Sequence, residues 1–132
     1  MPELEERYMR LRQSRLKTYY LRKKTVCKDS EGGTHPEYAF AEELSGESWP
    51  ASGKIQAEQY GERLSYIYNV RLDGKYNITS DEKGIIHYVF DNGRDIVEGD
   101  GICLFVGKEM NPDYRIISIK PYSHLRLEVE RI

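Results

Sequence analysis

The sequence predicts a mostly β protein, a small antiparallel barrel or sandwich of about seven strands with an N-terminal helix. Three observations favour this fold class. Short apolar runs rich in β-branched and aromatic residues recur along the chain, separated by Gly, Pro, Asn or Asp. Several runs alternate apolar and polar residues, the period of a strand with one buried face. The eleven tyrosines suit strands and surfaces that meet a partner.

Chain length and charge predict one domain with an arm. The 132 residues can bury a core of modest size. We divide them into a helical arm, residues 1–16, and a β-barrel domain, residues 17–132. Residues 1–24 contain eight Lys or Arg and three Glu, whereas the remainder contains twelve Lys or Arg and nineteen Asp or Glu. The asymmetry suggests that the basic arm of one copy attracts the acidic body of another. A solvated basic helix is the alternative explanation.

Residues 2–16 have the pattern of a short amphipathic helix. Pro2 suits the first turn, and the glutamates that follow favour the positive end of the helix dipole. The apolar stripe is narrow, so the helix needs a surface to lie against, either its own barrel or a neighbouring subunit. The residues that we expect at a contact between subunits are Leu4, Tyr8, Leu11, Arg7, Arg10, Arg12 and Arg15.

The segment after the arm is predicted to be a strand followed by a loop. Residues 17–28 change to period two, and their Lys and Arg side chains suit an edge strand because they discourage pairing with another chain. Residues 29–36 are polar and contain adjacent glycines, a composition typical of a loop.

The middle of the chain is predicted to contain two strands and an irregular stretch. Residues 37–44 fit a strand or a short helical turn, and residues 45–50 are irregular. Trp49, the single tryptophan, is expected to anchor an interface if exposed or to cap one end of the core if buried. Residues 53–58 are predicted as a short strand. Residues 62–72 show the cleanest alternation and are predicted as a longer strand that ends at an Asp-Gly turn.

The last third of the chain is predicted to be entirely strands and turns. Residues 85–90 and 95–97 are predicted to form a hairpin around an Asp-Asn-Gly turn. Residues 102–106, 114–119 and 124–132 are predicted as a three-stranded antiparallel meander. In the last of these runs leucines and a valine alternate with charged residues, so the charges are expected on the face away from the core.

The sequence assembles no catalytic site. His35 lies in a loop with Gly and Pro, His87 within an apolar strand, and His124 at the start of the last strand. None has a partner at the spacing of a ligand pair or a triad, and no phosphate-binding glycine motif is present. We therefore expect structural or solvent-facing histidines, no cofactor and no enzymatic activity. A small-molecule-binding or hydrolytic barrel is an alternative.

Neither the acidic residues nor the cysteines predict a metal site. Asp91, Asp95 and Asp100 are close in sequence, but their spacing does not match a calcium-binding loop, so turn-forming aspartates are the better interpretation. Cys27 and Cys103 lie far apart without a matching histidine cluster, which argues against zinc. We expect two buried reduced thiols.

Hydropathy and charge bound the possible partners. The sequence contains neither an apolar run long enough for a membrane span nor the apolar core of a signal peptide, so we expect a soluble protein made in the cytoplasm. Small β-barrels often bind single-stranded nucleic acid through stacked aromatics and a basic groove. The tyrosines fit this alternative, but the acidic body disfavours phosphate binding. An acidic surface instead suits a protein past which DNA slides.

Three stretches of the chain resemble a known protein family. They are residues 56–61 followed by an alternating strand, residues 95–102 and residues 114–119. The family patterns I-x-x-G-D-x-I and Y-x-V-x-x-I are matched by Ile96, Gly99, Asp100 and Ile102, and by Tyr114, Ile116 and Ile119, with Ile in place of Val. Over about residues 17–132 the chain resembles the head–tail joining proteins of tailed bacteriophages, also called head-closure, head-completion or stopper proteins, including neck proteins of related phage-tail-like particles.

The resemblance implies a small β-barrel that assembles into a virion neck ring, commonly of about twelve copies, below the portal and adaptor proteins. Such a ring closes the filled capsid, contacts a tail terminator or tail-joining protein, and meets packaged double-stranded DNA by passage or retention, without a membrane. A long loop that projects into the channel corresponds to residues 29–50. Gly99 and Asp100 are expected to form a barrel turn, Gly99 through its backbone angle and Asp100 by satisfying turn amides. The candidate channel or partner residues are Gly32, Gly33, His35 and Trp49.

Overall fold

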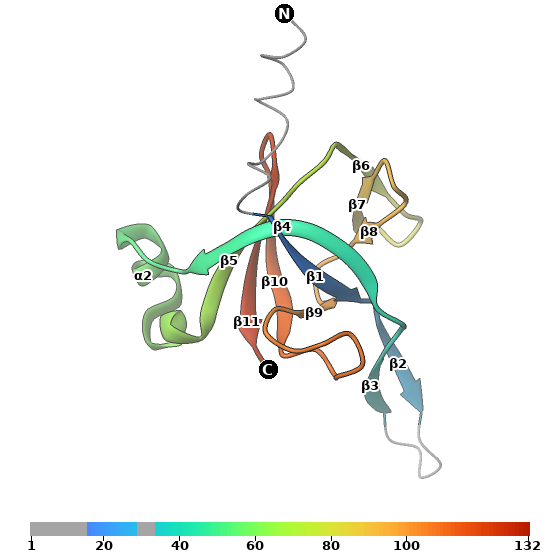
Figure 1. Ribbon diagram of the computed structural model, residues 1–132, viewed down its shortest axis with the longest axis horizontal. Helices are drawn as coiled ribbons and strands as arrows, with labels where there is room; N and C mark the ends of the chain where they lie inside the picture. The colour runs from blue at the N-terminus through green and yellow to red at the C-terminus, as the bar shows by residue number, and fades with distance from the viewer. Residues whose placement is uncertain (1–15, 29–33) are drawn as a thin grey trace, which may run out of the picture.

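The computed structural model describes residues 16–28 and 34–132 (Figure 1). The predicted N-terminal helix therefore lies outside the described residues except for Leu16, and so do Gly32 and Gly33. The described part is mostly β, with a closed antiparallel barrel, two small sheets, one short α-helix and one 3₁₀ helix. The predicted mostly β class and barrel are thus confirmed, although the chain is divided into more strands than expected.

Six strands close the barrel, and each pairs antiparallel with its neighbours. In order around the barrel they are β1 (Lys17–Arg22), β4 (Glu42–Pro50), β5 (Ile67–Leu72), β11 (Leu125–Arg131), β10 (Tyr114–Pro121) and β9 (Gly101–Cys103). Closure pairs the strands on both sides, so the barrel offers no free edge to another chain.

Two small sheets and a helical insertion surround the barrel. The hairpin of β2 (Lys24–Lys28) and β3 (Thr34–Tyr38) projects from it, and β6 (Tyr76–Ser80), β7 (Ile86–Phe90) and β8 (Asp95–Ile96) form a sheet on one side. The helices α2 (Lys54–Tyr60) and η2 (Gly61–Tyr66) connect β4 to β5. In Figure 1 the helical insertion and the β6–β8 sheet lie on opposite sides of the barrel.

The core lies inside the barrel, and the predicted C-terminal meander supplies a large part of it. Strands β9, β10 and β11 are consecutive and antiparallel, as expected, and Leu125, Leu127 and Val129 are fully buried. A β-bulge between Ile116 and Ser118 shifts the register of β10. Because of this extra residue, Ile116 and Ile119 both reach the core although three positions separate them.

Two predicted strands have different boundaries. Residues 17–28 form two strands rather than one, because the chain leaves the barrel at Lys23 and continues into the projecting hairpin. The stretch 45–50, predicted as irregular, belongs to β4, where pairing with both β1 and β5 holds it extended. The predicted channel loop over residues 29–50 therefore contains β3 and all of β4, so it is not a loop.

The prediction for the segment before β5 is wrong. Residues 53–58, predicted as a strand, largely belong to α2, in which no residue is buried and Ile55 is 81% exposed. The segment is rich in good helix formers and has no strand to pair with. In the predicted strand 62–72 only Ile67–Leu72 is extended, since η2 occupies the first part. Strand β5 is buried on both faces. This explains why the apolar Ile67 lies out of phase with Val70 and Leu72 in the alternation of apolar and polar residues.

The close approach of β4 to β5 gives a test of the barrel wall. A Cβ atom on Gly46 would collide with the backbone carbonyl oxygen of Arg71. We expect Gly46→Ala to lower the free energy of unfolding by about 1–3 kcal/mol, measured by urea denaturation, because neither strand can move without disturbing the barrel. The exposed neighbour Ser45 is the control, and Ser45→Ala should change stability by less than about 0.5 kcal/mol. Equal effects of the two substitutions would contradict the packing.

Candidate functional sites: a carboxylate network and a basic barrel face

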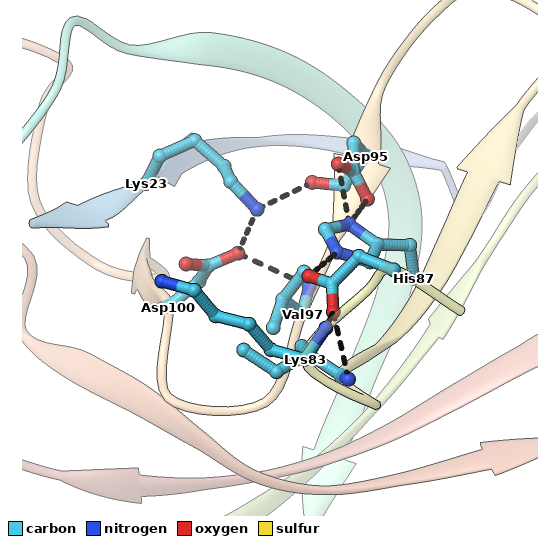
Figure 2. A network of polar contacts seen from close by, with 8 residues as sticks. Lys23, Lys83, His87, Asp95, Val97 and Asp100 are labelled. Carbon is cyan, nitrogen blue, oxygen red and sulfur yellow. Dashed lines mark hydrogen bonds and ion pairs between the residues drawn. The ribbon is translucent and has the colours of Figure 1, made fainter. Parts of the chain in front are cut away.

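A buried carboxylate joins the barrel to the base of the projecting hairpin (Figure 2). Gly99 has a φ of +97°, the left-handed conformation expected of it, and directs the chain so that Asp100 points inward, where it is 4% exposed. Asp100 Oδ2 accepts hydrogen bonds from Lys23 Nζ at 2.5 Å and from the Val97 amide at 3.1 Å, and Oδ1 accepts one from the Lys24 amide at 3.1 Å. The carboxylate thus fixes the turn before β9 to the point where β1 becomes β2.

The same network continues into the β6–β8 sheet (Figure 2). Lys23 Nζ also donates to the backbone oxygen of Asp95 at 2.9 Å. The ring of His87 lies between two carboxylates, with Nδ1 2.8 Å from Asp95 Oδ2 and Nε2 3.0 Å from Asp81 Oδ2. The hydrogen bonds to Asp81 and Asp95 raise the pKa of His87, and the same bond from His87 lowers the pKa of Asp81. This geometry favours an imidazolium that donates through both nitrogens.

The contacts of His87 with Asp81 and Asp95 connect β7, β8 and the turn after β6. We call these three residues the His87 clip. A catalytic triad also pairs a histidine with a carboxylate, but its other nitrogen must face the nucleophile. In this protein Asp81 occupies that position at Nε2. Asp81 Oδ1 is itself held by the amides of Lys83 and Ile85. The arrangement therefore holds three segments together electrostatically.

A second buried carboxylate holds α2 against the barrel wall. Glu128, on the outer face of β11, is fully buried, contrary to the expectation that this face is solvated. Gln56 Nε2 donates to Glu128 Oε2 at 2.8 Å and to Asn69 Oδ1 at 2.7 Å, and Lys120 Nζ lies 3.2 Å from Glu128 Oε1. Burial acts to raise the pKa of Glu128, but these contacts outweigh it and the pKa is lowered. Burial is the main cause that raises the pKa of Tyr60 to about 12, and the charge of the Glu128 carboxylate is the second cause.

The neighbouring carboxylate on the same strand is held in the same way. Glu130, also predicted on a solvated face, is buried, and it receives Arg63 Nε at 2.6 Å and Arg115 Nη2 at 2.9 Å. The hydrogen bond from Arg63 is the main cause that lowers the pKa of Glu130. The outer face of β11 is therefore an internal surface wherever the helical insertion covers it.

Next to the part of the barrel wall that α2 and η2 cover, three basic residues form a row, which we call the basic row. Lys120 on β10, Arg126 on β11 and Arg71 on β5 are directly opposite one another in the strand register. The ring of Trp49 lies next to both arginines, and each guanidinium carbon is 5.2 Å from the ring centroid. Trp49 is thus half-buried within a cation–π stack, so it neither caps the core nor stands alone at the surface. Arg71 Nη2 also pairs with Glu47 at 2.8 Å.

Two adjoining hollows flank this basic row. One, of about 440 Å³, lies between α2 and the β10–β11 turn, and the other, of about 270 Å³, lies over Trp49. Both are lined by Tyr122 and Arg126, so they form one surface feature. We call the larger hollow the basic groove. It is lined by Ser52, Gly53, Lys54, Ile55, Gln56, Gln59, Lys120, Tyr122, Arg126 and Glu128.

The other residues singled out from the sequence do not converge. The backbone of His35 pairs with that of Cys27 in the β2–β3 hairpin. His124 precedes β11 and lines the smaller hollow, and Cys103 is a buried free thiol whose pKa is raised by burial. The seven arm residues lie outside the described part of the chain. Within residues 16–28 and 34–132, no three His, Cys, Asp or Glu side chains gather as they would to hold a metal ion.

Sequence reasoning missed both the His87 clip and the basic row. The sequence signal for the His87 clip was one Asp before β7 and one after it: Asp81 is six residues before His87, and Asp95 is eight residues after it. The basic row has no local signal, because its members belong to strands that are far apart in sequence and meet only through the barrel register.

Loss of the Asp100 charge should loosen the base of the hairpin. Asp100→Asn keeps the side-chain shape but removes the partner of Lys23, and it also places an amide near backbone donors. We expect the free energy of unfolding to fall by about 2–3 kcal/mol, measured by urea denaturation. Asp91→Asn, in an exposed turn, is the matched control and should change it by less than about 0.5 kcal/mol. An Asp100→Asn protein as stable as the wild type would contradict the role of this carboxylate.

The His87 clip predicts a defined pH dependence of stability. The folded state raises the pKa of His87, so its contribution is fully present below about pH 6.5 and is lost as the pH rises through the folded-state pKa. Asp81 acts oppositely: its pKa is lowered, so its contribution is lost only as the pH falls through that lowered value. The stability difference between wild type and His87→Gln should therefore be largest in mildly acidic solution and should shrink toward alkaline pH.

Urea denaturation of wild type, His87→Gln, Asp81→Asn and the double variant over a pH series measures this dependence. The double-mutant cycle isolates the coupling between Asp81 and His87. A coupling that does not change with pH would show that His87 is held without its charge.

Comparison with known proteins assigns this chain to no family. No family model, no curated protein and no solved structure matches it. Among the described residues, the helices are too short or too polar to cross a membrane. The function is therefore inferred from the residues and their geometry.

Proposed function

We propose that this chain is a non-enzymatic structural subunit of a virion neck ring, in a tailed bacteriophage or a related phage-tail-like particle. In this role it closes the DNA-filled capsid below the portal and adaptor proteins and offers a docking surface to the tail. The observation that carries the proposal is a closed barrel from which one anchored hairpin projects. A closed barrel cannot join other copies by strand addition, so its side chains and its projection must make the contacts.

The base of the hairpin is clamped to the barrel, which suits a part that must keep its direction. The Ala39 amide donates to the Lys23 carbonyl oxygen at 2.8 Å, and Arg22 Nε donates to the Ala39 carbonyl oxygen at 2.5 Å. Arg22 Nη1 also donates to the backbone oxygen of Met110 at 2.6 Å. With the Asp100 carboxylate, these bonds hold both strands of the hairpin at its root.

We assign the channel-facing role to this hairpin, residues 24–38. The resemblance implied a long loop over residues 29–50, but β4 belongs to the barrel wall and leaves only the hairpin free to project. In the proposed ring the hairpins converge on the packaged double-stranded DNA, which they retain or allow to pass. The portal or adaptor ring and the tail terminator or tail-joining protein then contact the two ends of the barrel.

Single-stranded nucleic-acid binding is a second candidate, and the basic row on the barrel wall favours it. The sequence shows an excess of positive over negative charge only in residues 1–24, whereas the structure gathers Lys120, Arg126 and Arg71 on one face of the body. However, guanidinium groups already lie beside the ring of Trp49, so this ring is not free to stack on bases, which leaves Tyr122 as the exposed aromatic of this face. The neck subunit is therefore the stronger proposal.

Removal of the arm tests the proposal. We expect the full chain to form rings with an axial opening in negative-stain electron microscopy. A chain without residues 1–15 should keep the circular-dichroism spectrum and cooperative unfolding of the barrel, but its rings should be fewer or absent because the arm supplies apolar contacts to a neighbour.

Two outcomes would count against this view. Undiminished rings from the shortened chain would contradict the role of the arm. Salt-dependent binding of a labelled oligothymidylate by the full chain, without any ring, would favour the nucleic-acid alternative.

A further inference from the structure

The basic groove combines positive charge with apolar side chains that have no cover. Lys54 and Arg126 line it together with Lys120. Ile55 is 81% exposed and Tyr122 is 56% exposed on the same groove. Large apolar side chains gathered beside charges on a concave surface mark a place where a partner binds.

The electrostatics of the groove are incomplete within one copy. Three positive side chains directly opposite one another across a sheet repel each other. Arg71 and Lys120 each have a carboxylate partner on the barrel wall. In the described part of the chain, Arg126 and Lys54 form no ion pair, and Arg126 Nε is buried without a hydrogen-bond partner. The groove therefore fits a partner that brings carboxylates and apolar side chains together.

Part of that combination is found on the β6–β8 sheet and the turn after β6. Residues 73–100, which contain the β6–β8 sheet, include seven Asp or Glu and three Lys or Arg. Ile78, Ile85 and Ile86 are about half exposed on this sheet. Ile78 lies within β6, whereas Ile85 and Ile86 follow the turn after β6, where Glu82 is exposed. Of the acidic residues, Asp100 is buried and Asp81 and Asp95 hold His87. The turn therefore presents Ile85 and Ile86 beside Glu82, with the exposed Lys83 next to it.

We propose that the basic groove of one copy receives the β6–β7 turn of a second copy, residues 80–86. The apolar contact joins Ile85 and Ile86 to Ile55 and Tyr122, and Glu82 meets the unpaired cations. This inference rests on the proposed neck ring and adds the surfaces through which neighbouring copies meet. In the structure the apolar side chains of both surfaces are exposed, so one copy does not fill its own groove; they are Ile55, Tyr122, Ile85 and Ile86. The contact is therefore head to tail, and it makes a ring when the rotation between copies closes.

Single-stranded nucleic acid is the rival occupant of the groove. It would satisfy the cations, but it would leave Ile55 uncovered, and the flanking ring of Trp49 already lies against two arginines. A protein surface that carries both isoleucine and glutamate matches the groove in both respects. The experiment below separates the two occupants.

Charge exchange between the two surfaces tests the proposal. The basic-groove variant is Lys54→Glu with Arg126→Glu, and the acidic-turn variant is Glu82→Lys. Lys120 and Asp81 stay unchanged, because they hold a buried carboxylate and the His87 clip. Lys108→Glu, in an exposed loop, is the matched control. Sedimentation velocity of the full chain at low salt gives the association constant, and circular dichroism verifies the fold of each variant.

We expect each reversed variant to associate at least about tenfold more weakly than the wild type, because like charges then face each other. An equimolar mixture of the two variants should associate within about threefold of the wild type, since each reversed surface meets a complementary one. Lys108→Glu should leave association unchanged. The mixture result cannot arise from misfolding, which mixing would not repair.

Several outcomes would overturn the inference. These are a wild-type chain that stays monomeric at every concentration, reversed variants that associate normally, or a mixture that is no better than its components. Fluorescence anisotropy with a labelled oligothymidylate is the second arm. Binding by the wild type that is lost in the basic-groove variant would assign the groove to nucleic acid. Rings that persist despite both reversals would leave the neck proposal standing and remove only this interface.

Discussion

The arrangement of the three sheets depends on one buried anion, the carboxylate of Asp100. Its partners come from the junction between β1 and β2 and from the turn before β9. Lys23 extends the connection to the β6–β8 sheet through the backbone oxygen of Asp95. Without the carboxylate, the amides of Val97 and Lys24 would lose their acceptor in a partly buried site, a loss more costly than the hydrogen bonds themselves contribute. The barrel closes through its own ladders, but the directions of the hairpin and of the side sheet follow from this anion.

The candidate binding groove exists because the helical insertion is short. Along the outer face of β11, Glu130 and Glu128 are covered by η2 and α2, whereas Arg126, two residues earlier, lies at the edge of the cover. Since α2 extends only over Lys54–Tyr60, it leaves part of the wall open beside the β10–β11 turn. The carboxylates under the cover are held by Gln56 and by basic side chains, whereas Arg126 at its edge has a buried Nε without a hydrogen-bond partner. One structural element thus creates both a stabilised interior and an unsatisfied rim.

How much of this could be predicted from sequence depended on whether the signal was local. The C-terminal meander and the turn at Gly99 follow from period two and from turn chemistry, which act over a few residues. The α2 segment was mistaken for a strand because Ile55 and Ala57 alternate over too few residues to separate the two periods, and nothing local shows that a partner strand is missing. The basic row could not be predicted, since Arg71 and Arg126 become neighbours only when β5 and β11 pair in one particular register.

A closed barrel constrains how copies of this chain can assemble. Strand addition to the barrel is blocked, so the contacts that the barrel wall makes rest on side chains, and exposed ion pairs contribute at most about 1 kcal/mol each. Such a contact is weak between two free copies. In the proposed ring every copy has two neighbours, and the contact that closes the ring forms within one assembly, so its effective concentration is high. Weak side-chain contacts then suffice for a stable ring, although each contact alone would hold two copies together only weakly.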